Sequence, residues 1–224
     1  MEEKQIVKIQ HTYDVTHDVR CFRLEKPDNF SFEPGQAADV SINRPGWEDE
    51  IRPFTFTCLP DDDYLEFTIK IYSDHDGVTR QLGQTGPGDE LILHGVFGAI
   101  KYRGEGLFIA GGAGITPFLS ILRGLARDRA IRGNTLIFGN KTRSDIIQEE
   151  ELRRMLGDRF INILSEEQAE GYEYGFISRD VLEKHIGKRG QLYYLCGPPE
   201  MVDKVSLDLA DLGIGDESIV KEDS

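Results

Sequence analysis

The chain has 224 residues, enough for one large domain or two small ones with a well-buried core. Its 40 acidic and 26 basic residues give a net charge of −14, which repels nucleic acid and anionic membranes, so neither is an expected partner. Three widely separated cysteines suggest neither a zinc site nor an iron–sulfur cluster, and no metal site is predicted. The start MEEKQIVKIQ lacks an apolar signal core, and no segment is long enough to span a bilayer, so a cytoplasmic protein is expected.

The first hundred residues consist of short alternating or β-branched segments separated by turn-forming residues. These segments predict six strands, which with one short helix at 78–82 favour an antiparallel barrel. The predicted strands cover residues 5–11, 19–24, 37–42, 54–58, 65–71 and 90–94.

From about Gly104, apolar strands alternate with helices, which predicts βαβ units and a five-stranded parallel sheet. The predicted strands cover 107–110, 135–139, 160–164, 192–196 and 218–221, and the predicted helices cover 118–127, 145–156, 179–186 and 200–212. Charge and glycine interrupt both patterns at 101–106. We therefore expect one domain over residues 1–101 and a second over residues 104–224.

Two short motifs in the first half are candidates for binding a flavin. In Arg52-Pro53-Phe54-Thr55, the guanidinium can form a fork with a phosphate, the aromatic ring can pack on an isoalloxazine, and Thr55 can face its N5–O4 edge. In Gly77-Val78-Thr79, the backbone N–H groups that begin a short helix suit a pyrophosphate. The alternatives are a surface ion pair with barrel packing for the first motif and an ordinary helix start for the second.

Two further motifs follow predicted strands of the second half. The glycines of Gly111-Gly112-Ala113-Gly114-Ile115-Thr116-Pro117 allow close approach of a ligand, Thr116 can cap the next helix, and Pro117 suits its first turn. Cys196-Gly197-Pro198-Pro199-Glu200 places a thiol at a strand's carboxyl end, where ligands bind in open α/β sheets. A plain helix entry and a buried structural cysteine are the alternatives.

With these motifs in order, the chain resembles the ferredoxin–NADP reductase superfamily over essentially its whole length, and most of all the short bacterial flavodoxin, ferredoxin or flavin reductases. Gly86-Pro87-Gly88-Asp89 and Gly95-Val96-Phe97-Gly98 are similar to the closing strands of that family's barrel. The resemblance implies an FAD-binding barrel followed by an NAD(P)-binding domain. It also implies hydride transfer from the nicotinamide C4 to the flavin N5, with Thr55, Thr116 and Cys196 nearest the reacting rings.

The resemblance assigns cofactor contacts to residues that match the family's motifs. The implied cofactor-binding set is Arg52, Pro53, Phe54, Thr55, Ile69, Lys70, Ile71, Gly77, Val78, Thr79, Gly111, Gly112, Gly114, Thr116, Pro117, Lys141, Arg143, Ser165, Cys196, Gly197 and Pro198.

The choice of nucleotide depends on the segment after the third strand of the second domain. Plant-type members of the family have a Ser-Arg pair there that grips the 2′-phosphate of NADPH, whereas this chain has Ser165-Glu166. A carboxylate beside that phosphate would repel it, which favours NADH. Lys141 and Arg143 follow the preceding strand and could supply positive charge, so NADPH stays open.

Several features bear on where the electrons go. Phe54 replaces the commoner tyrosine, as in family members that reduce free flavin, so FAD can be either a tight group or a loosely bound substrate. The chain ends without a terminal aromatic and without a cysteine-rich ferredoxin domain, which predicts a separate acceptor such as ferredoxin or flavodoxin. Such carriers are usually acidic, and candidates for a basic face that attracts one are Lys101, Arg103, Arg123, Arg127, Arg129 and Arg132.

These observations predict a monomeric FAD-dependent NAD(P)H reductase that passes single electrons to a carrier protein. Two alternatives remain at this stage: an NAD(P)H:flavin oxidoreductase that releases reduced flavin, and an electron-transfer subunit that docks into a larger complex.

Overall fold

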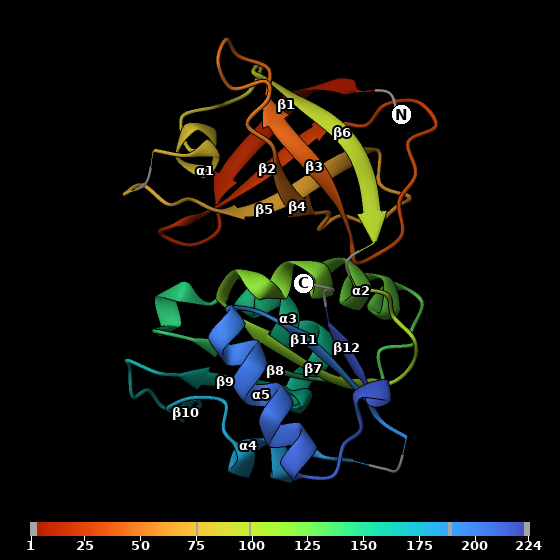
Figure 1. Cartoon of the computed structure of the whole chain (residues 1–224), viewed down its shortest axis with the longest axis vertical. Coiled ribbons are helices and arrows are strands. Elements are labelled where there is room, and N and C mark those ends of the chain that lie inside the picture. The colour runs from red at the N-terminus through yellow and green to blue at the C-terminus, as the bar shows by residue number, and fades with distance from the viewer. Residues whose placement is uncertain (1–3, 75, 99, 188–189, 222–224) are drawn as a thin grey trace.

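The computed structural model describes residues 4–74, 76–98, 100–187 and 190–221, and it shows an N-terminal β domain stacked on a C-terminal α/β domain (Figure 1). The tail Glu222-Asp223-Ser224, which the sequence analysis found to lack an aromatic, and residues 1–3 of the first predicted domain lie outside the described residues. Among the described residues, no helix is long and apolar enough to cross a membrane.

The N-terminal domain is the predicted six-stranded antiparallel barrel. Its strands are β1 (Gln5–Asp14), β2 (Val19–Glu25), β3 (Gln36–Ile42), β4 (Arg52–Thr55), β5 (Tyr64–Lys70) and β6 (Glu90–Gly98). They form one sheet in the order β4-β3-β6-β1-β2-β5, and a bridge between Phe56 and Phe67 links its two edges. The short helix α1 (Val78–Leu82) buries Val78 and Leu82 in the barrel core.

The C-terminal domain has a parallel sheet with helices on both faces. Its strands are β7 (Gly106–Gly111), β8 (Thr135–Asn140), β9 (Phe160–Leu164), β10 (Glu173–Tyr174), β11 (Leu192–Cys196) and β12 (Ile219–Lys221). Its α-helices are α2 (Thr116–Arg127), α3 (Glu149–Leu156), α4 (Arg179–His185) and α5 (Pro199–Asp211).

The prediction of five strands in this sheet is wrong by one. The sixth, β10, pairs with the end of β9 through only two residues, which is too short for any hydrophobic alternation to reveal. The observed strand order is β10-β9-β8-β7-β11-β12. The order reverses between β7 and β11, so the loops after these two strands flank the position where doubly wound sheets bind ligands.

Two hydrophobic layers cover the faces of the parallel sheet. Side chains of α2 and α3, including Phe118 and Leu152, pack on one face, and side chains of α4 and α5, including Leu182 and Leu209, pack on the other. Helix α2 lies on the side of this domain that faces the barrel (Figure 1). The predicted domain limits at residues 101 and 104 fall in the connection between Gly98, which ends β6, and Gly106, which begins β7.

Candidate functional site

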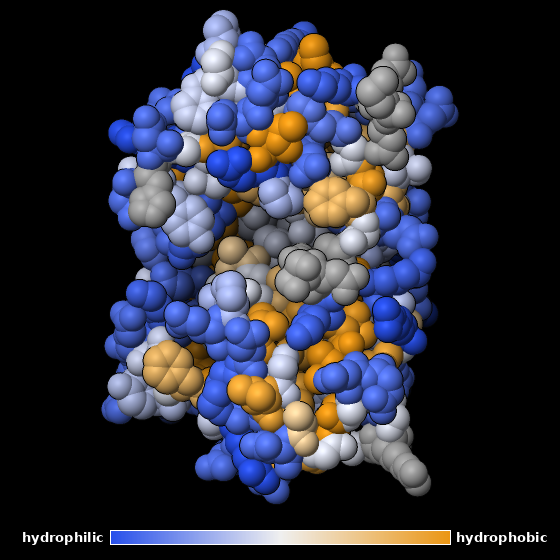
Figure 2. All heavy atoms as spheres, in the orientation of Figure 1, coloured by the Kyte–Doolittle hydropathy of each residue, from blue (hydrophilic) through white to orange (hydrophobic). Residues whose placement is uncertain are grey.

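A cavity of about 460 Å³ lies where the two domains meet. The face of the molecule shown in Figure 2 is hollowed at this level. Both domains contribute to the wall, which is formed by Ala37, Asp39, Pro53, Phe54, Thr55, Thr68, Ile69, Lys70, Tyr72, Thr79, Phe97, Gly98, Ala113 and Thr116.

The cavity brings together seven of the residues assigned to cofactor binding from the sequence. They come from β4, β5, α1 and the start of α2: Pro53, Phe54, Thr55, Ile69, Lys70, Thr79 and Thr116. Thr55 and Thr116 were both expected near the reacting rings, and both line this one space from opposite domains. They are about sixty positions apart in the sequence, and the stacking of the two domains brings them to the same cavity.

The cavity wall also contains residues that no sequence motif had assigned to the site. They are Ala37, Asp39, Thr68, Tyr72, Phe97, Gly98 and Ala113. Ala37 is the cross-strand partner of Thr55, so pairing of β3 with β4 puts it there. Phe97 and Gly98 belong to the closing-strand motif, and that motif was the signal for them. Tyr72 is 47% exposed and Phe97 is 40% exposed, so two aromatic rings at this cavity remain open to solvent.

Phe54 is held by the barrel on one side. Its ring lies 6.3 Å from that of Phe67, centroid to centroid, in a tilted arrangement, and it packs against the barrel core while also lining the cavity. The ring therefore has a supported orientation and can offer a flat apolar wall to a planar ligand.

Arg52 precedes Pro53 at the start of β4 and does not itself line the cavity. Its side chain is 52% exposed, and Nη2 is 3.9 Å from the Glu50 carboxylate, a distance at the limit of an ion pair. Nη1 donates a 2.6 Å hydrogen bond to the backbone carbonyl of Ile51. Within the described part of the chain, most of the guanidinium's five donors therefore stay available for an anion.

The Gly77-Val78-Thr79 segment contributes to the cavity through Thr79 alone. Gly77 precedes the first turn of α1 in an extended conformation, and no side chain caps the helix there. The side chain of Val78 is buried in the barrel core, so only its backbone N–H could meet a phosphate.

The two loops at the switch point pack directly against each other. A Cβ added at Gly114 would lie 2.3 Å from the Cys196 carbonyl oxygen, and one added at Gly111 would lie 2.5 Å from the Met201 sulfur. These two glycines therefore serve contact between the loops. Gly112 differs, because it has φ +51° and nothing lies within 4 Å of its missing Cβ. Cys196, Gly197 and Pro198 form the other side of this contact, and they do not line the cavity.

The expected capping role of Thr116 is wrong. Residues Gly112–Ile115 form a 3-10 turn that runs into α2, and Ile115 occupies the N-cap position. The Thr116 hydroxyl instead donates a 3.0 Å hydrogen bond to the Ala113 carbonyl. Pro117 is buried in the first turn of α2, in line with its expected structural role.

The two candidate cations for a 2′-phosphate already have acidic neighbours. Lys141 Nζ forms a 3.2 Å ion pair with Glu166, and Arg143 Nε lies 4.0 Å from Glu149. The backbone N–H of Arg143 also donates to the Glu167 carboxylate at 2.7 Å. Ser165 is fixed by a 2.9 Å hydrogen bond from its N–H to the Asn140 carbonyl.

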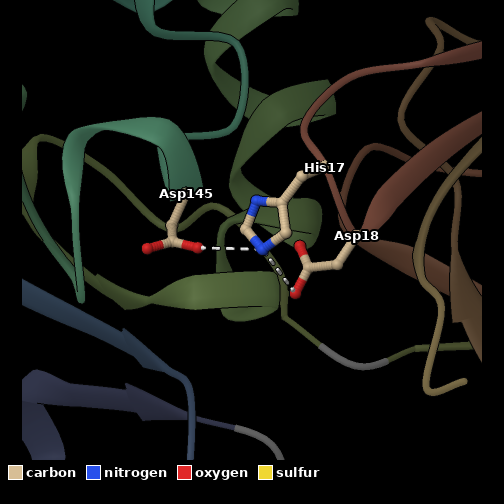
Figure 3. Close-up of side chains that lie close together, drawn as sticks. All are labelled: His17, Asp18 and Asp145. Carbon is tan, nitrogen blue, oxygen red and sulfur yellow. Dashed lines mark ion pairs between the residues drawn. The ribbon is translucent and has the colours of Figure 1, made fainter.

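A row of polar contacts links Lys70 of the cavity wall to Asp145 of the C-terminal domain, and Figure 3 shows its members His17, Asp18 and Asp145. Lys70 Nζ lies 2.7 Å from Asp18, and the His17 imidazole lies 3.8 Å from Asp18 and 3.7 Å from Asp145. Burial raises the pKa of Asp18, but the hydrogen bond and charge of Lys70 lower it further, to below its ordinary value. Among the described residues, His17, Asp18 and Asp145 are the one trio spaced to hold a metal ion, but the Lys70 ammonium already engages Asp18.

Three of the six cations expected to form a basic face, Lys101, Arg123 and Arg127, form ion pairs with acidic residues of the same chain, whereas Arg103, Arg129 and Arg132 are exposed. Arg123 is 17% exposed and pairs with Glu66 and Glu151, while Arg127 pairs with Asp61 of the barrel at 2.8 Å. Lys101 likewise forms a 2.8 Å ion pair with Glu33. These cations join parts of the same chain, which the sequence alone did not indicate.

Comparison with known proteins places this geometry in a family. The Oxidoreductase FAD-binding domain matches residues 6–102, and the Oxidoreductase NAD-binding domain matches residues 108–206. The chain belongs to the ferredoxin–NADP reductase superfamily. Its two domains stand in the order that the sequence motifs predicted.

Two curated relatives and one solved structure illustrate the likeness. The chain is 31% identical over 214 residues to the ferredoxin–NAD(P)(+) reductase component of the naphthalene 1,2-dioxygenase system of Pseudomonas putida, covering 91% of this chain and 64% of that protein. It is 34% identical over 226 residues to the reductase component of propane 2-monooxygenase from Mycolicibacterium goodii, covering 93% and 62%. A ferredoxin NADP+ reductase from Neisseria gonorrhoeae with bound FAD and NADP has the same fold, with a TM-score of 0.83, 20% identity, and coverage of 95% and 93%. The chain thus spans a little under two thirds of the length of these curated relatives.

The residues present fit both cofactors of this family. The cavity has a volume typical of small-molecule sites and offers Phe54, hydroxyl groups and a nearby exposed guanidinium to a flavin. The open space at Gly112, at the carboxyl ends of β7 and β11, lets a dinucleotide approach the backbone closely.

Acid is expected to weaken the protein through Glu66, which is 1% exposed on β5. Burial raises its pKa, but the charge and hydrogen bonds of Arg123, with those of Arg23 and Thr57, lower it further, to below the ordinary value. A carboxyl with a lowered folded-state pKa stabilises the fold above the unfolded-state pKa, and this stabilisation is lost as the pH falls through the folded-state pKa.

Urea unfolding at pH 7 and at pH 4 measures this effect. We expect Glu66→Gln to cost about 2 kcal/mol at pH 7, because the buried carboxylate loses its charge-assisted hydrogen bonds with Arg123 and Arg23 while Arg123 keeps Glu151, and to reduce the loss of stability on acidification. Glu183→Gln, at an exposed position on α4, should keep the wild-type pH dependence. Equal acid sensitivity in wild type and Glu66→Gln would exclude Glu66 as the source.

Proposed function

We propose that this protein is an FAD-dependent NADH reductase that passes electrons to a separate acceptor protein. The observation that carries the proposal is the single cavity lined by the barrel motif Pro53-Phe54-Thr55 and by Ala113 and Thr116 of the nucleotide domain. A flavin against the first set and a nicotinamide against the second would share one space. When bound, the nicotinamide supplies a hydride and the flavin accepts it and can release electrons one at a time.

In this proposal the chain's own residues bind and orient the two rings. Phe54 supports one ring face, and the hydroxyl and backbone groups of Thr55 offer hydrogen bonds at its edge. Thr116, locked to Ala113 by its hydrogen bond, forms the opposite wall. Cys196 and Gly197 support this wall from behind through their contact with Gly114. The protein's contribution is therefore chiefly positioning.

The acceptor in the proposal is a small carrier such as a ferredoxin or flavodoxin, and the protein acts as a monomer. Support for a separate carrier comes from the relatives, which are named as reductase components of dioxygenase and monooxygenase systems. The test is NADH-dependent reduction of purified ferredoxin or flavodoxin by FAD-loaded protein, with sedimentation of the same sample. Reduction of neither carrier, with rapid reduction of free FAD, would contradict the carrier assignment.

The second candidate is a reductase that releases reduced flavin. It is favoured by Phe54 at the position where the commoner residue is tyrosine, and by the solvent exposure of Arg52. Retention of FAD through repeated ultrafiltration separates the two functions. Stoichiometric retention supports the carrier reductase, and complete loss supports the flavin-releasing enzyme.

The proposed nucleotide is NADH. A 2′-phosphate near Ser165 would meet Glu166 and Glu167, and the Lys141 charge there is already balanced by Glu166. Glu166→Arg is therefore expected to shift the ratio of NADPH to NADH activity toward NADPH by about tenfold, equivalent to about 1.4 kcal/mol. Glu183→Arg, which makes the same charge change on α4, should leave the ratio unchanged. An unchanged ratio in Glu166→Arg would remove the basis for the NADH preference.

A further inference from the structure

Helix α2 is hydrogen-bonded to the barrel just after β4, a strand that lines the cavity. The Ser120 hydroxyl donates a 2.7 Å hydrogen bond to the Cys58 carbonyl, and Arg123 Nη1 donates a 2.6 Å hydrogen bond to the Thr57 carbonyl. Both acceptors lie just after β4, the strand that ends at Thr55. The first residue of α2 is Thr116, so the helix connects these two hydrogen bonds rigidly to the opposite cavity wall.

The Arg123 guanidinium is paired on every side. Nη1 also donates to Glu66 at 2.8 Å, while Nε and Nη2 donate to the two oxygens of Glu151 at 2.8 and 2.7 Å. Glu66 belongs to β5 of the barrel and Glu151 to α3 of the nucleotide domain. A single side chain therefore fixes α2 to elements of both domains. Such two-pronged, charge-assisted contacts restrict geometry more than a single hydrogen bond does.

The same network reaches the cavity wall. Thr57 Oγ1 donates to Glu66 at 2.9 Å and lies 3.2 Å from the hydroxyl of Thr68, and Thr68 lines the cavity. A shift of Arg123 would therefore displace Thr57 and Thr68 on the barrel side. It would also displace Thr116, which lies about two helical turns away along α2.

We propose that Arg123 is a positioning residue that sets the separation between the Thr116 wall and the Thr55 wall of the cavity. This inference rests on the proposed function, because that separation is the distance over which a hydride would pass. Displacement of the reacting groups by about 1 Å can slow a reaction about 100-fold. Arg123 acts through the elements it holds and touches neither ring.

Arg127 provides a matched comparison. It lies one turn further along α2 and also joins the barrel, through a 2.8 Å ion pair with Asp61. That pair is exposed, at 46% and 80%, whereas Glu66 beside Arg123 is 1% exposed. Exposed pairs contribute little, so loss of Arg127 removes a domain contact without loosening the buried network.

The experiment compares Arg123→Met, Arg123→Lys and Arg127→Met as FAD-loaded proteins mixed anaerobically with NADH. For Arg123→Met we expect retained FAD, an NADH dissociation constant within about threefold of wild type, and a limiting flavin-reduction rate lowered about 100-fold. The long-wavelength absorbance produced by stacked nicotinamide and flavin should also be lost. Arg123→Lys should recover part of the rate, and Arg127→Met should match wild type.

Wild-type rate and stacking absorbance in Arg123→Met, or equal losses in Arg123→Met and Arg127→Met, would overturn the inference. If Arg123→Met does not fold, Glu151→Gln takes its place, because it weakens the same guanidinium contacts at a partly exposed residue.

If the wild-type protein is not reduced by NADH, the proposed function fails. Hydrogen exchange of the apoprotein then tests Arg123 by itself, and faster exchange at residues 56–58 and 116–120 is expected in Arg123→Met but not in Arg127→Met. Unchanged exchange would also overturn the inference.

Discussion

Replacing Arg52 with alanine is expected to abolish retention of FAD during purification while leaving the fold intact. The guanidinium is half exposed, its nearest carboxylate is 3.9 Å away, and it takes no part in the barrel core, so little folding free energy depends on it. A phosphate that accepts two charge-assisted hydrogen bonds from it would lose about 3 kcal/mol of binding, or about 100-fold in affinity.

Flavin content after purification and FAD titration of the apoprotein measure this effect. Arg44→Ala is the matched control, since Arg44 is also an arginine of the barrel domain, is partly exposed, and pairs with Asp89 at 3.7 Å. The control should bind FAD as the wild type does. An Arg52→Ala protein that still binds FAD with wild-type affinity would remove Arg52 from the flavin site.

Gly114→Ala is expected to abolish reduction by NADH without loss of FAD. The added Cβ would lie 2.3 Å from the Cys196 carbonyl oxygen and 2.6 Å from the Gly197 Cα, and these are backbone atoms that cannot move aside cheaply. The two loops at the switch point must separate, which displaces Thr116 at the start of α2. We expect the flavin-reduction rate to fall about 100-fold or more.

The control for this substitution is Gly124→Ala in the same helix. Its added Cβ would meet only Leu59 Cδ2, at 3.7 Å, so ordinary contact is expected. Removing a glycine from a helix interior should stabilise the protein by about 0.5 to 1 kcal/mol. Thermal unfolding and FAD content verify that both variants are folded. Wild-type reduction by a folded Gly114→Ala protein would show that the contact between the loops has no part in nucleotide use.

The sequence predicted the architecture because each domain has its own periodicity and its own motifs. Alternating segments mark the barrel strands, and apolar strands between amphipathic helices mark the parallel sheet. β10 could not be predicted in this way, because a two-residue strand has no period. Thr116 was misassigned as a cap because the 3-10 turn over Gly112–Ile115 moves the N-cap to Ile115.

Site residues could be predicted where they belong to a short motif. They could not be predicted where their role depends on a partner far away in the sequence. Pro53, Phe54, Thr55 and Thr116 line one cavity as their motifs suggest. Arg123 looked like part of a solvated basic face, since its partner Glu66 is 57 positions away in the barrel. Glycines 111 and 114 were expected to admit a ligand, yet the close approach they permit is to the neighbouring loop. Such non-local partners become visible only in the folded structure.

The central claim is that one cavity brings a flavin and a nicotinamide together. Its most direct test is to mix FAD-loaded protein with NADH, and separately with NADPH, in the absence of oxygen and to follow the flavin absorbance in a stopped-flow instrument. We predict rapid bleaching with NADH and slower bleaching with NADPH. No bleaching with either nucleotide, in protein that holds FAD, would contradict the claim and favour an electron-transfer subunit that depends on a larger complex.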